Sequence, residues 1–532
     1  MTQPLFSHPS SLKIFGPAGS GKTRELIRIL QEHVAEGDFA LRDGIIVSFT
    51  RAAAYDIAKR VNPDGEPGKY HCTLHALCKR YYGFDGEIAE ARLREFFRAE
   101  HIPFTGGPVG DGEEWAPTSD WRPSEGATIV SFFSQQRNRL LSIPEARKII
   151  RPPDDHVRWW QPGAFERIWG RYAAWKDENR LVDFTDMLEH AALDPPRMRF
   201  AFFVMDECQD ATPLQWQVAQ AFAAQAEVAY LGGDDDQAIY SWAGATPHEF
   251  LSAETGAEDV LHVNHRSGAV IVDAAQQFIR QNRDRKEKDM RAAHEGGEIS
   301  RSYYVPELDP AQSTMIMARA HYLTTPLMDE LTRRGYPFVD VRGSQGVGGG
   351  AATAYGRLRR LRAGERLTLD EWRLTVAGIP SAGPWLIRGT KKRLHAIDSR
   401  TRAGTYVRAC DIGAYGATED LVAAIKAGAT DPLGRVHRDR LKYLRGVADR
   451  YGPEYLDESK ARATCVAGPI HAFKGLEADH VIIHEGMPPA ATREVHRDPE
   501  PERRVFYVAM TRAKDRITWV NGPAFANFRE VL

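Results

Sequence analysis

The octapeptide Gly16–Thr23, GPAGSGKT, constrains the fold of this chain more than any other stretch. It fits the pattern G-x-x-x-x-G-K-[ST] in full, in which glycines permit a tight turn and backbone N–H groups cradle phosphates. LKIF before it predicts a short strand, and TRELIRILQEHV after it predicts an amphipathic helix whose N-terminus favours an anion. The alternative, a glycine-rich turn with an accidental Lys-Thr pair, is disfavoured because both flanking elements are in place.

We therefore predict an α/β fold in which this loop binds a nucleotide. Lys22 would reach the outer phosphates, and the Thr23 hydroxyl would coordinate Mg²⁺. The residues assigned to the loop are Gly16, Pro17, Ala18, Gly19, Ser20, Gly21, Lys22 and Thr23.

A second stretch, FVMDECQDATPLQWQ, is acidic and supplies the residues that a phosphate-binding loop needs to hold a metal and a water. Residues 201–205, AFFVM, predict a buried strand of a parallel sheet, and Asp206 and Glu207 follow at its carboxyl end, where doubly wound sheets bind ligands. On their own, two such acids could simply be solvated at a loop start. Together with the phosphate loop they predict a nucleoside triphosphatase, in which Asp206 holds the metal and Glu207 positions the attacking water.

Composition limits the remaining possibilities. The chain has 532 residues, enough for two to four domains, with 42% apolar and 27% charged residues, which is typical of a soluble globular protein. No apolar run approaches the roughly 18 residues of a membrane span. The five scattered cysteines form no CxxC pair, so we expect reduced thiols and a cytoplasmic location. The net charge of -2 does not indicate nucleic-acid binding, so any groove that binds nucleic acid would have to be basic locally.

DECQD, residues 206–210, resembles the acidic DE…QD signature of superfamily 1 helicases of the UvrD/Rep/PcrA type. Other stretches resemble further motifs of that family, in the family's order: residues 45–61 (motif Ia), 72–80 (Ib), 181–188, 231–245 (LGGDDDQAIYSWAGA, III), 263–267 (VNHRS, IV), 471–483 (V) and 502–514 (VI).

The resemblance implies ATP and Mg²⁺ as ligands and assigns roles at the nucleotide. Arg266 and Arg512 would be arginine fingers reaching across a cleft between two motor domains, and Gln237 would sense the γ-phosphate. Taken singly, these residues could be surface arginines and an ordinary polar loop residue. The other residues assigned to the nucleotide are Arg24, His265, Gly475 and Glu477. Glu477 could instead be an acid favoured at a helix start. Because His265 stands where the family usually has a tyrosine, selectivity for adenine stays open.

A translocase also needs aromatic rings on which bases stack. Tyr240 and Trp242 are one residue apart, and an extended segment would place both rings on one face. The plainer alternative is that Trp242 is a core anchor. The resemblance also assigns DNA contacts to Phe49, Thr50, His75 and His471. A lone phenylalanine or histidine is more often structural.

The resemblance implies two RecA-like parallel-sheet P-loop motor domains, each with a largely helical insert. We place the first motor at residues 1–85 and 179–262, its insert at 86–178, the second motor at 263–340 and 463–532, and a reduced insert at 341–462. The basic run RDRKEKDMR, residues 283–291, is expected to be a solvated helix face or to touch phosphates.

The predicted function is an ATP-dependent single-stranded DNA translocase and DNA helicase, moving from 3′ to 5′. The expected partners are single-stranded and partly duplex DNA, with no membrane, and the chain is expected to act as a monomer or weak dimer. Two alternatives stay open: a DNA translocase that strips proteins without unwinding, and a DNA-binding scaffold switched by nucleotide.

Overall fold

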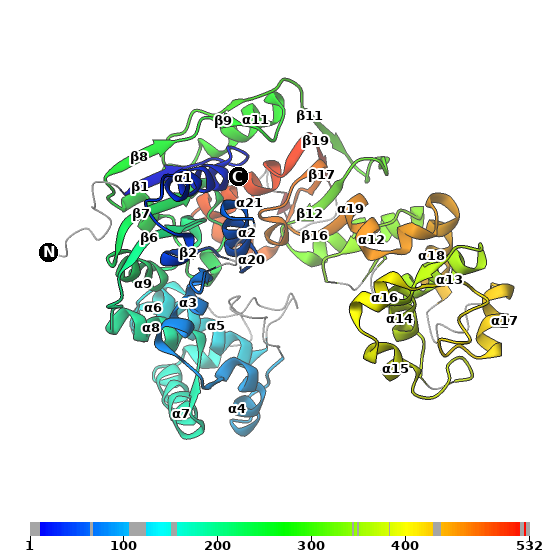
Figure 1. Cartoon of the computed structure of the whole chain (residues 1–532). Coiled ribbons are helices and arrows are strands. Elements are labelled where there is room, and N and C mark those ends of the chain that lie inside the picture. The colour runs from blue at the N-terminus through cyan, green and yellow to red at the C-terminus, as the bar shows by residue number, and fades with distance from the viewer. Residues whose placement is uncertain are drawn as a thin grey trace. The chain divides into compact units, whose positions relative to one another are not determined.

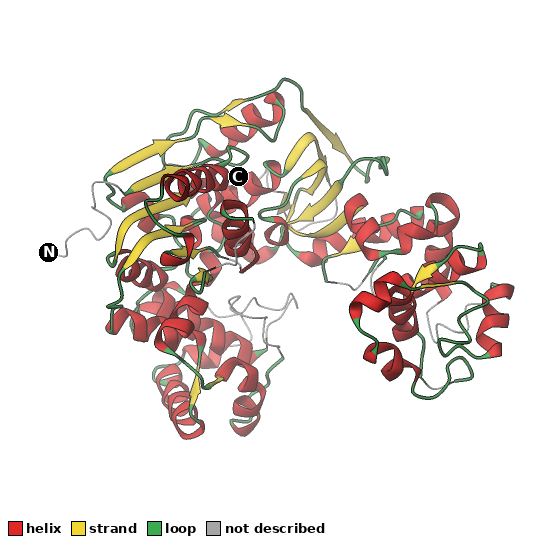
Figure 2. Ribbon diagram, in the orientation of Figure 1, coloured by secondary structure: helices red, strands yellow, loops and turns green. Residues whose placement is uncertain are grey.

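A computed structural model describes residues 11–49, 51–63, 68–105, 124–150, 157–342, 345–347, 350–381, 383–428, 438–521 and 526–527. The chain divides into two compact units (Figures 1 and 2). The first unit comprises residues 1–297 and 493–511, and the second comprises residues 298–492 and 512–531. No helix in the described ranges is long and apolar enough to cross a membrane.

The first unit is built on a six-stranded sheet in which every pair of neighbours is parallel. The strand order is β3-β2-β6-β7-β1-β8. The bounds are β1 Leu12–Phe15, β2 Ile45–Val47, β3 His71–Cys72, β6 Phe200–Met205, β7 Ala226–Gly233 and β8 Ala257–Val260.

Helices cover both faces of this sheet because its strands are apolar on both sides. Along β6, Phe202 and Val204 enter one core, which contains residues of α1 and α2, while Phe203 and Met205 enter another, which contains residues of α3, α8 and α9. The bounds are α1 Lys22–Glu36, α2 Arg51–Val61, α3 Leu74–Tyr82, α8 Phe184–Leu193, α9 Pro213–Ala223 and α10 His248–Ser252, with the short 3-10 helices η1 Leu41–Asp43, η4 Cys208–Asp210, η5 Asp235–Gln237 and η6 Ser241–Ala243.

The insert of the first unit is helical, as expected, and has a core of its own. Phe132 and Phe165 stack at its centre with ring centroids 3.7 Å apart, and Trp159, Trp169 and Trp175 pack against this core. The bounds are α4 Leu93–Ala99, α5 Glu125–Asn138, α6 Ile143–Ile149 and α7 Ala164–Asn179, the 3-10 helices η2 Ala89–Arg92 and η3 Val157–Trp160, and the paired strands β4 Glu87–Ile88 and β5 Leu181–Val182.

The first unit continues past residue 262, where the sequence-based boundary lies. Near this boundary, β8 ends at Val260 and a separate strand begins at Val263. That strand pairs with residues 291–292 outside the main sheet. The bounds are β9 Val263–Asn264, α11 Ala269–Ile279, β10 Arg291–Ala292 and α21 Glu500–Met510. Hydrogen bonds and ion pairs to the phosphate loop and to η5, described below, hold this part in the first unit.

The second unit contains another six-stranded parallel sheet, in the order β11-β19-β17-β12-β16-β13. The bounds are β11 Glu298–Ser302, β12 Thr314–Ala318, β13 Val339–Asp340, β16 Cys465–Pro469, β17 Ala478–His484 and β19 Ala513–Val520. This unit also contains α12 His321–Arg334, α19 Glu458–Thr464, η8 Pro453–Leu456, η9 Ile470–Phe473 and the antiparallel pair β18 Gly486–Met487 and β20 Ala526–Asn527. Helix α20, Pro489–Val495, begins in the second unit, and its last residues are assigned to the first. Two parallel sheets with flanking helices confirm the predicted fold class.

The insert of the second unit is also helical, and its core is continuous with that of the sheet. Trp372 is fully buried there, in the same cluster as Ile482 of β17. The bounds are α13 Gly350–Arg362, α14 Leu369–Gly378, α15 Thr390–Ala396, α16 Ser399–Gly404, α17 Glu419–Ala427 and α18 Arg438–Tyr451, with the antiparallel strands β14 Leu367–Thr368 and β15 Tyr406–Val407.

Candidate nucleotide and DNA site

The phosphate loop joins β1 to α1, as the sequence predicts. Gly16 donates its N–H to the Gly233 carbonyl at 3.0 Å, which fixes the start of the loop on β7. Gly19 and Gly21 have φ of 74° and 84°, a region that side chains disfavour. A Cβ at Gly19 would also lie 2.8 Å from the Cβ of Arg266. The loop therefore needs glycine here both for its turn and for the segment packed on it.

Four predicted side chains meet beside this loop. The Thr23 hydroxyl donates to Asp206 Oδ2 at 2.6 Å, and Lys22 Nζ lies 3.3 Å from Glu207 Oε1 and 3.9 Å from Asp206 Oδ1. Lys22 and Asp206 are buried, and Glu207 is part-exposed. The parallel sheet produces this meeting, because β1 and β6 both end at its carboxyl edge.

The charges of this cluster depend on one another. Burial alone would lower the pKa of Lys22, but Glu207, Asp206 and Asp234 raise it above the ordinary value, so the ammonium stays charged. Burial raises the pKa of Asp206, against the opposing effect of Lys22. A buried ammonium held by carboxylates is poised to bind an anion such as a phosphate.

The residues present fit a nucleotide phosphate group with Mg²⁺. The Ser20 hydroxyl is buried and has no hydrogen-bond partner among the described residues, so a phosphate oxygen could satisfy it. The Thr23 hydroxyl and the Asp206 carboxylate lie side by side and are the hard oxygen ligands that Mg²⁺ prefers. Arg24, also assigned to the nucleotide, is exposed in the first turn of α1.

Gln209 is a site residue to which the sequence reasoning gave no role. It is fully buried, donates from Nε2 to Glu207 Oε2 at 2.6 Å, and accepts at Oε1 from the Asp234 N–H at 2.9 Å. Asp234 in turn accepts from Gln237 Nε2 at 2.6 Å. A hydrogen-bonded chain thus links Glu207 to Gln237. Its only signal in the sequence was the glutamine of DECQD.

Residues 263–267 lie directly against the phosphate loop. Asn264 donates from Nδ2 to the Ala18 carbonyl at 2.7 Å, and its Oδ1 accepts from the N–H groups of Arg266 and Ser267 at 2.9 and 2.8 Å. His265 donates its N–H to the Gly19 carbonyl at 2.8 Å, and its side chain is exposed. Arg266, one predicted finger, therefore lies beside the loop, and its Nη1 donates to the Thr511 carbonyl at 3.0 Å.

The other residues assigned to the nucleotide lie in the second unit. Arg512 is almost fully buried, and its Nη1 donates to the Leu476 carbonyl at 3.3 Å. Glu477 is exposed and pairs with Lys514 at 3.2 Å, and Gly475 has φ of 83°. Arg512, Gly475 and Glu477 thus gather where β17 and β19 begin.

The aromatic residues assigned to DNA come together, though not as an extended segment. Trp242 lies in η6, and its ring meets that of Tyr240 edge-on with centroids 6.2 Å apart. Phe49 stacks on Tyr240 with centroids 4.9 Å apart and an interplanar angle of 17°. All three rings are half-buried, so Trp242 is not a core anchor. Thr50 lies outside the described residues.

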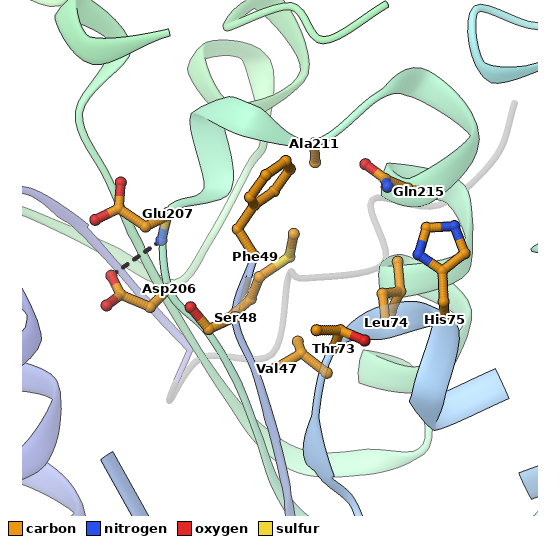
Figure 3. A pocket seen from close by; sticks show the side chains of 11 residues that line it. Val47, Ser48, Phe49, Thr73, Leu74, His75, Asp206, Glu207, Ala211 and Gln215 are labelled. Atoms are coloured by element: carbon orange, nitrogen blue, oxygen red, sulfur yellow. Dashed lines mark hydrogen bonds between the residues drawn. The ribbon is translucent and has the colours of Figure 1, made fainter. Parts of the chain in front are cut away.

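One of these aromatic residues, Phe49, lines a pocket together with the acidic residues (Figure 3). Asp206 and Glu207 line one side of it, His75 and Gln215 line the other, and Phe49 lies between. Burial lowers the pKa of His75 to about 4, although Asp183 opposes the shift, so the ring is neutral near pH 7. His471, assigned to DNA as well, is half-buried in η9 of the second unit.

The basic run at residues 283–291 is not a solvated helix face, because these residues form no helix and two of their cations are paired with acids. Arg285 and Lys288 are buried against the three aspartates of η5 and its N-cap, Asp234, Asp235 and Asp236. The sequence did not predict this pairing, because the basic run and the aspartates lie far apart in the chain.

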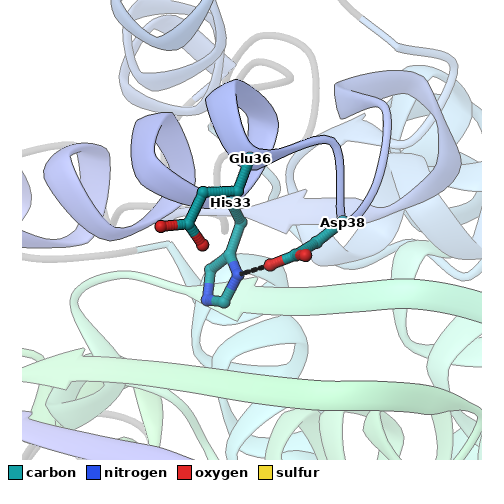
Figure 4. Close-up of side chains that lie close together, drawn as sticks. All are labelled: His33, Glu36 and Asp38. Carbon is teal, nitrogen blue, oxygen red and sulfur yellow. Dashed lines mark hydrogen bonds and ion pairs between the residues drawn. The ribbon is translucent and has the colours of Figure 1, made fainter.

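His33, Glu36 and Asp38 form a surface cluster with metal-ligand chemistry (Figure 4). Both ring nitrogens of His33 are already used: Nδ1 pairs with Asp38 at 2.6 Å, and Nε2 with the Tyr230 hydroxyl at 2.7 Å. The cluster therefore ties the end of α1 to β7 and offers no free imidazole nitrogen to an ion.

This geometry defines a P-loop nucleotide site with paired carboxylates on a parallel sheet. Comparison with protein families identifies which class of P-loop protein this is. Residues 2–258 match the UvrD/REP helicase N-terminal domain, and residues 458–521 match the UvrD-like helicase C-terminal domain. The chain belongs to the UvrD/REP helicase family, which confirms the resemblance seen in its motifs.

Individual relatives are distant in sequence. The chain is 25% identical to the ATP-dependent DNA helicase UvrD2 of Mycobacterium tuberculosis (strain ATCC 25618 / H37Rv), over 94% of this chain and 75% of that protein. It is 25% identical to the ATP-dependent DNA helicase PcrA of Bacillus subtilis (strain 168), over 59% of this chain and 43% of that protein. Among solved structures, the arterivirus nonstructural protein 10 helicase aligns with a TM-score of 0.33 and 12% identity, over 99% of this chain and 64% of that one.

Proposed function

We propose that this chain hydrolyses ATP with Mg²⁺ and uses the energy to move along single-stranded DNA, from 3′ to 5′, and to unwind duplex. The observation that carries the proposal is the meeting of Lys22, Thr23, Asp206 and Glu207 beside one glycine loop. Relatives named as ATP-dependent DNA helicases support the same reaction.

At the nucleotide, Lys22 would bind the outer phosphates while the loop N–H groups from Gly16 to Gly21 surround them. Thr23 and Asp206 would hold Mg²⁺, which supplies charge neutralisation at the phosphates. Glu207 would orient the attacking water, and Arg266 and Arg512 would stabilise charge on the departing phosphoryl group. Arg24, His265, Gly475 and Glu477 complete the proposed nucleotide contacts, with His265 stacking less extensively on a base than a tyrosine would.

On the DNA side, the half-buried rings of Phe49, Tyr240 and Trp242 would stack with bases, which any sequence permits. Tyr240 and Trp242 follow Gln237 closely in the chain, so a change at the phosphates has a short path to the stacked bases. Thr50, His75 and His471 are the remaining proposed contacts. Because burial keeps His75 neutral, we assign it a hydrogen bond rather than an ion pair with phosphate.

The proposal is tested by measuring ATP hydrolysis with and without single-stranded DNA. We expect strong stimulation by DNA, followed by strand displacement from a duplex with a 3′ single-stranded tail. Streptavidin removal without strand displacement would identify a translocase that strips proteins. DNA binding without hydrolysis would identify a nucleotide-switched scaffold, and hydrolysis indifferent to DNA would exclude a DNA-coupled motor.

Replacing Tyr240 with alanine is expected to weaken binding to single-stranded DNA. The substitution removes one stacking platform, worth about 1–3 kcal/mol per base, and leaves Phe49 without its stacked neighbour. Fluorescence anisotropy with a labelled oligonucleotide measures the effect.

Tyr240→Phe serves as the conservative variant and should bind nearly as well as the wild type. Tyr303→Ala removes an exposed ring far along the chain (78% exposed) and should leave the affinity unchanged. Wild-type affinity in Tyr240→Ala would remove this residue from the DNA site.

A further inference from the structure

Three consecutive aspartates, Asp234, Asp235 and Asp236, are buried at the carboxyl end of β7, each at most 1% exposed. Three adjacent carboxylates cannot all ionise in such a place without cations, because burial and mutual repulsion both disfavour the charged forms. The cations come from the loop between α11 and β10, at Arg285 and Lys288. The nearby backbone N–H of Lys286 adds a hydrogen bond to Asp235 Oδ2 at 2.9 Å.

Lys288 is the centre of this cluster. Its Nζ lies 3.0 Å from Asp234 Oδ1, 2.5 Å from Asp235 Oδ1 and 3.0 Å from Asp236 Oδ2. Arg285 grips Asp236 with two parallel bonds, Nε to Oδ1 at 2.9 Å and Nη2 to Oδ2 at 2.8 Å. Lys288 is thus the one side chain of the described loop that contacts all three acids.

Asp234 connects the cluster to the proposed catalytic residues. Its Oδ1 faces Lys288, and its Oδ2 accepts from Gln237 Nε2 at 2.6 Å. An ionised carboxylate can only accept, so the amide nitrogen of Gln237 must face Asp234. The Gln237 carbonyl oxygen is then the end of the amide that does not face Asp234. The Asp234 N–H also holds Gln209, which holds Glu207.

We propose that Lys288 is a positioning residue for ATP hydrolysis: by pairing with Asp234, it holds this carboxylate against Gln237, fixes the orientation of the Gln237 amide and steadies the chain from Gln237 to Glu207. This inference rests on the proposed function and assigns it a residue outside the nucleotide-contacting motifs. Lys288 reaches the nucleotide only through Asp234 and Gln237.

The same loop is anchored on α21. The N–H groups of Arg283 and Asp284 donate to Glu500 Oε1 and Oε2 at 2.8 and 3.3 Å, and Arg504 Nη2 donates to the Asp284 carbonyl at 2.5 Å. The loop that carries Lys288 is therefore also held from outside the aspartate cluster.

The test compares Lys288→Met with Lys288→Arg. Lys288→Met removes the charge and keeps much of the side-chain length, and we expect kcat for DNA-stimulated hydrolysis to fall about tenfold or more while KM for ATP changes less than about threefold. Lys288→Arg restores a cation and should recover most of kcat. Affinity for a fluorescent ATP analogue, measured without turnover, should stay close to the wild-type value.

Two readouts separate positioning from mere support of the fold. They are the fall in kcat without a matching change in KM, and the recovery of kcat when Lys288→Arg restores the cation.

Two further variants serve as a control for charge removal and as a second test of the contact with Asp234. Lys286→Met removes a nearby, partly exposed charge that pairs with Glu258 and should leave kcat unchanged. Asp234→Asn should reproduce the fall in kcat, and it decides the question if Lys288→Met does not fold. Unchanged kcat in folded Lys288→Met or in Asp234→Asn would overturn the inference, as would an equal loss in Lys286→Met. A wild type without ATPase activity would instead overturn the proposed function.

Discussion

Replacing Glu207 with glutamine is expected to lower kcat for ATP hydrolysis by roughly 10²- to 10⁴-fold, the usual contribution of a positioned general base. Glutamine has nearly the same shape but cannot take a proton from water. Glu207 stands in the left-handed region at φ of 58°, and Lys22 and Gln209 hold its two carboxylate oxygens. The Glu207 side chain is thus held in one position, whereas a solvated acid at the start of a loop would not be.

ATP binding should survive this substitution. The change removes a negative charge beside the proposed phosphate site, so affinity for a fluorescent ATP analogue should equal or exceed that of the wild type. Steady-state hydrolysis and equilibrium binding are measured on the same preparation. Glu254→Gln, at an exposed carboxylate of the same unit, should match the wild type in both. Hydrolysis at the wild-type rate in Glu207→Gln would exclude Glu207 as the residue that activates water.

Replacing Arg137 with methionine is expected to destabilise the first unit by about 3–5 kcal/mol, the usual effect of removing one partner from a buried ion network. Arg137 is 6% exposed and joins α5 to α8. Its Nη1 contacts both oxygens of Asp183 at 3.0 and 2.9 Å, and its Nη2 contacts Asp186 and Glu189, each at 2.6 Å. Methionine fills similar space but leaves these carboxylates short of one cation.

The effect should depend on pH. Burial would raise the pKa of Asp183, but Arg137 and Lys176 outweigh it and lower the pKa to about 2. Because this folded-state value lies below the ordinary one, Asp183 stabilises the wild type at neutral pH, and that contribution is lost as the pH falls from about 4 towards 2. In Arg137→Met, Asp183 gains its proton at higher pH, so the stability difference between the two proteins should narrow on acidification.

Thermal unfolding at several pH values, with hydrogen exchange of the amides in α8, measures both effects. Arg98→Met, at an exposed arginine of the same insert, should change stability little. A midpoint for Arg137→Met that equals the wild type at pH 7 would show that this network does not hold the insert in place.

Contiguous motifs predicted the part of the site that lies on neighbouring residues. GPAGSGKT carries its turn, its anion ligands and its helix start within eight positions, so its structure could be inferred without knowing the fold. The approach of Thr23 to Asp206 followed from one general rule, that parallel strands end at a common edge. Two parallel sheets followed from the resemblance to a family.

Pairings between distant segments could not be predicted in the same way. The charges at Arg285 and Lys288 resembled a solvated run because nothing in their local spacing points to the aspartates of η5. Tyr240 and Trp242 share a surface through a 3-10 turn, not through extended alternation, and their neighbour Phe49 comes from the end of another strand. Such contacts depend on how the chain folds back, which a spacing rule does not contain.

Asn264 has a consequence for redesign of this protein. One amide holds the Ala18 carbonyl with its nitrogen and the N–H groups of Arg266 and Ser267 with its oxygen. A single side chain therefore links the phosphate loop to the segment that carries Arg266. Replacing the phosphate loop by that of a relative should succeed only when residues 263–267 are exchanged along with it, because hydrogen bonds of Asn264 join the two segments.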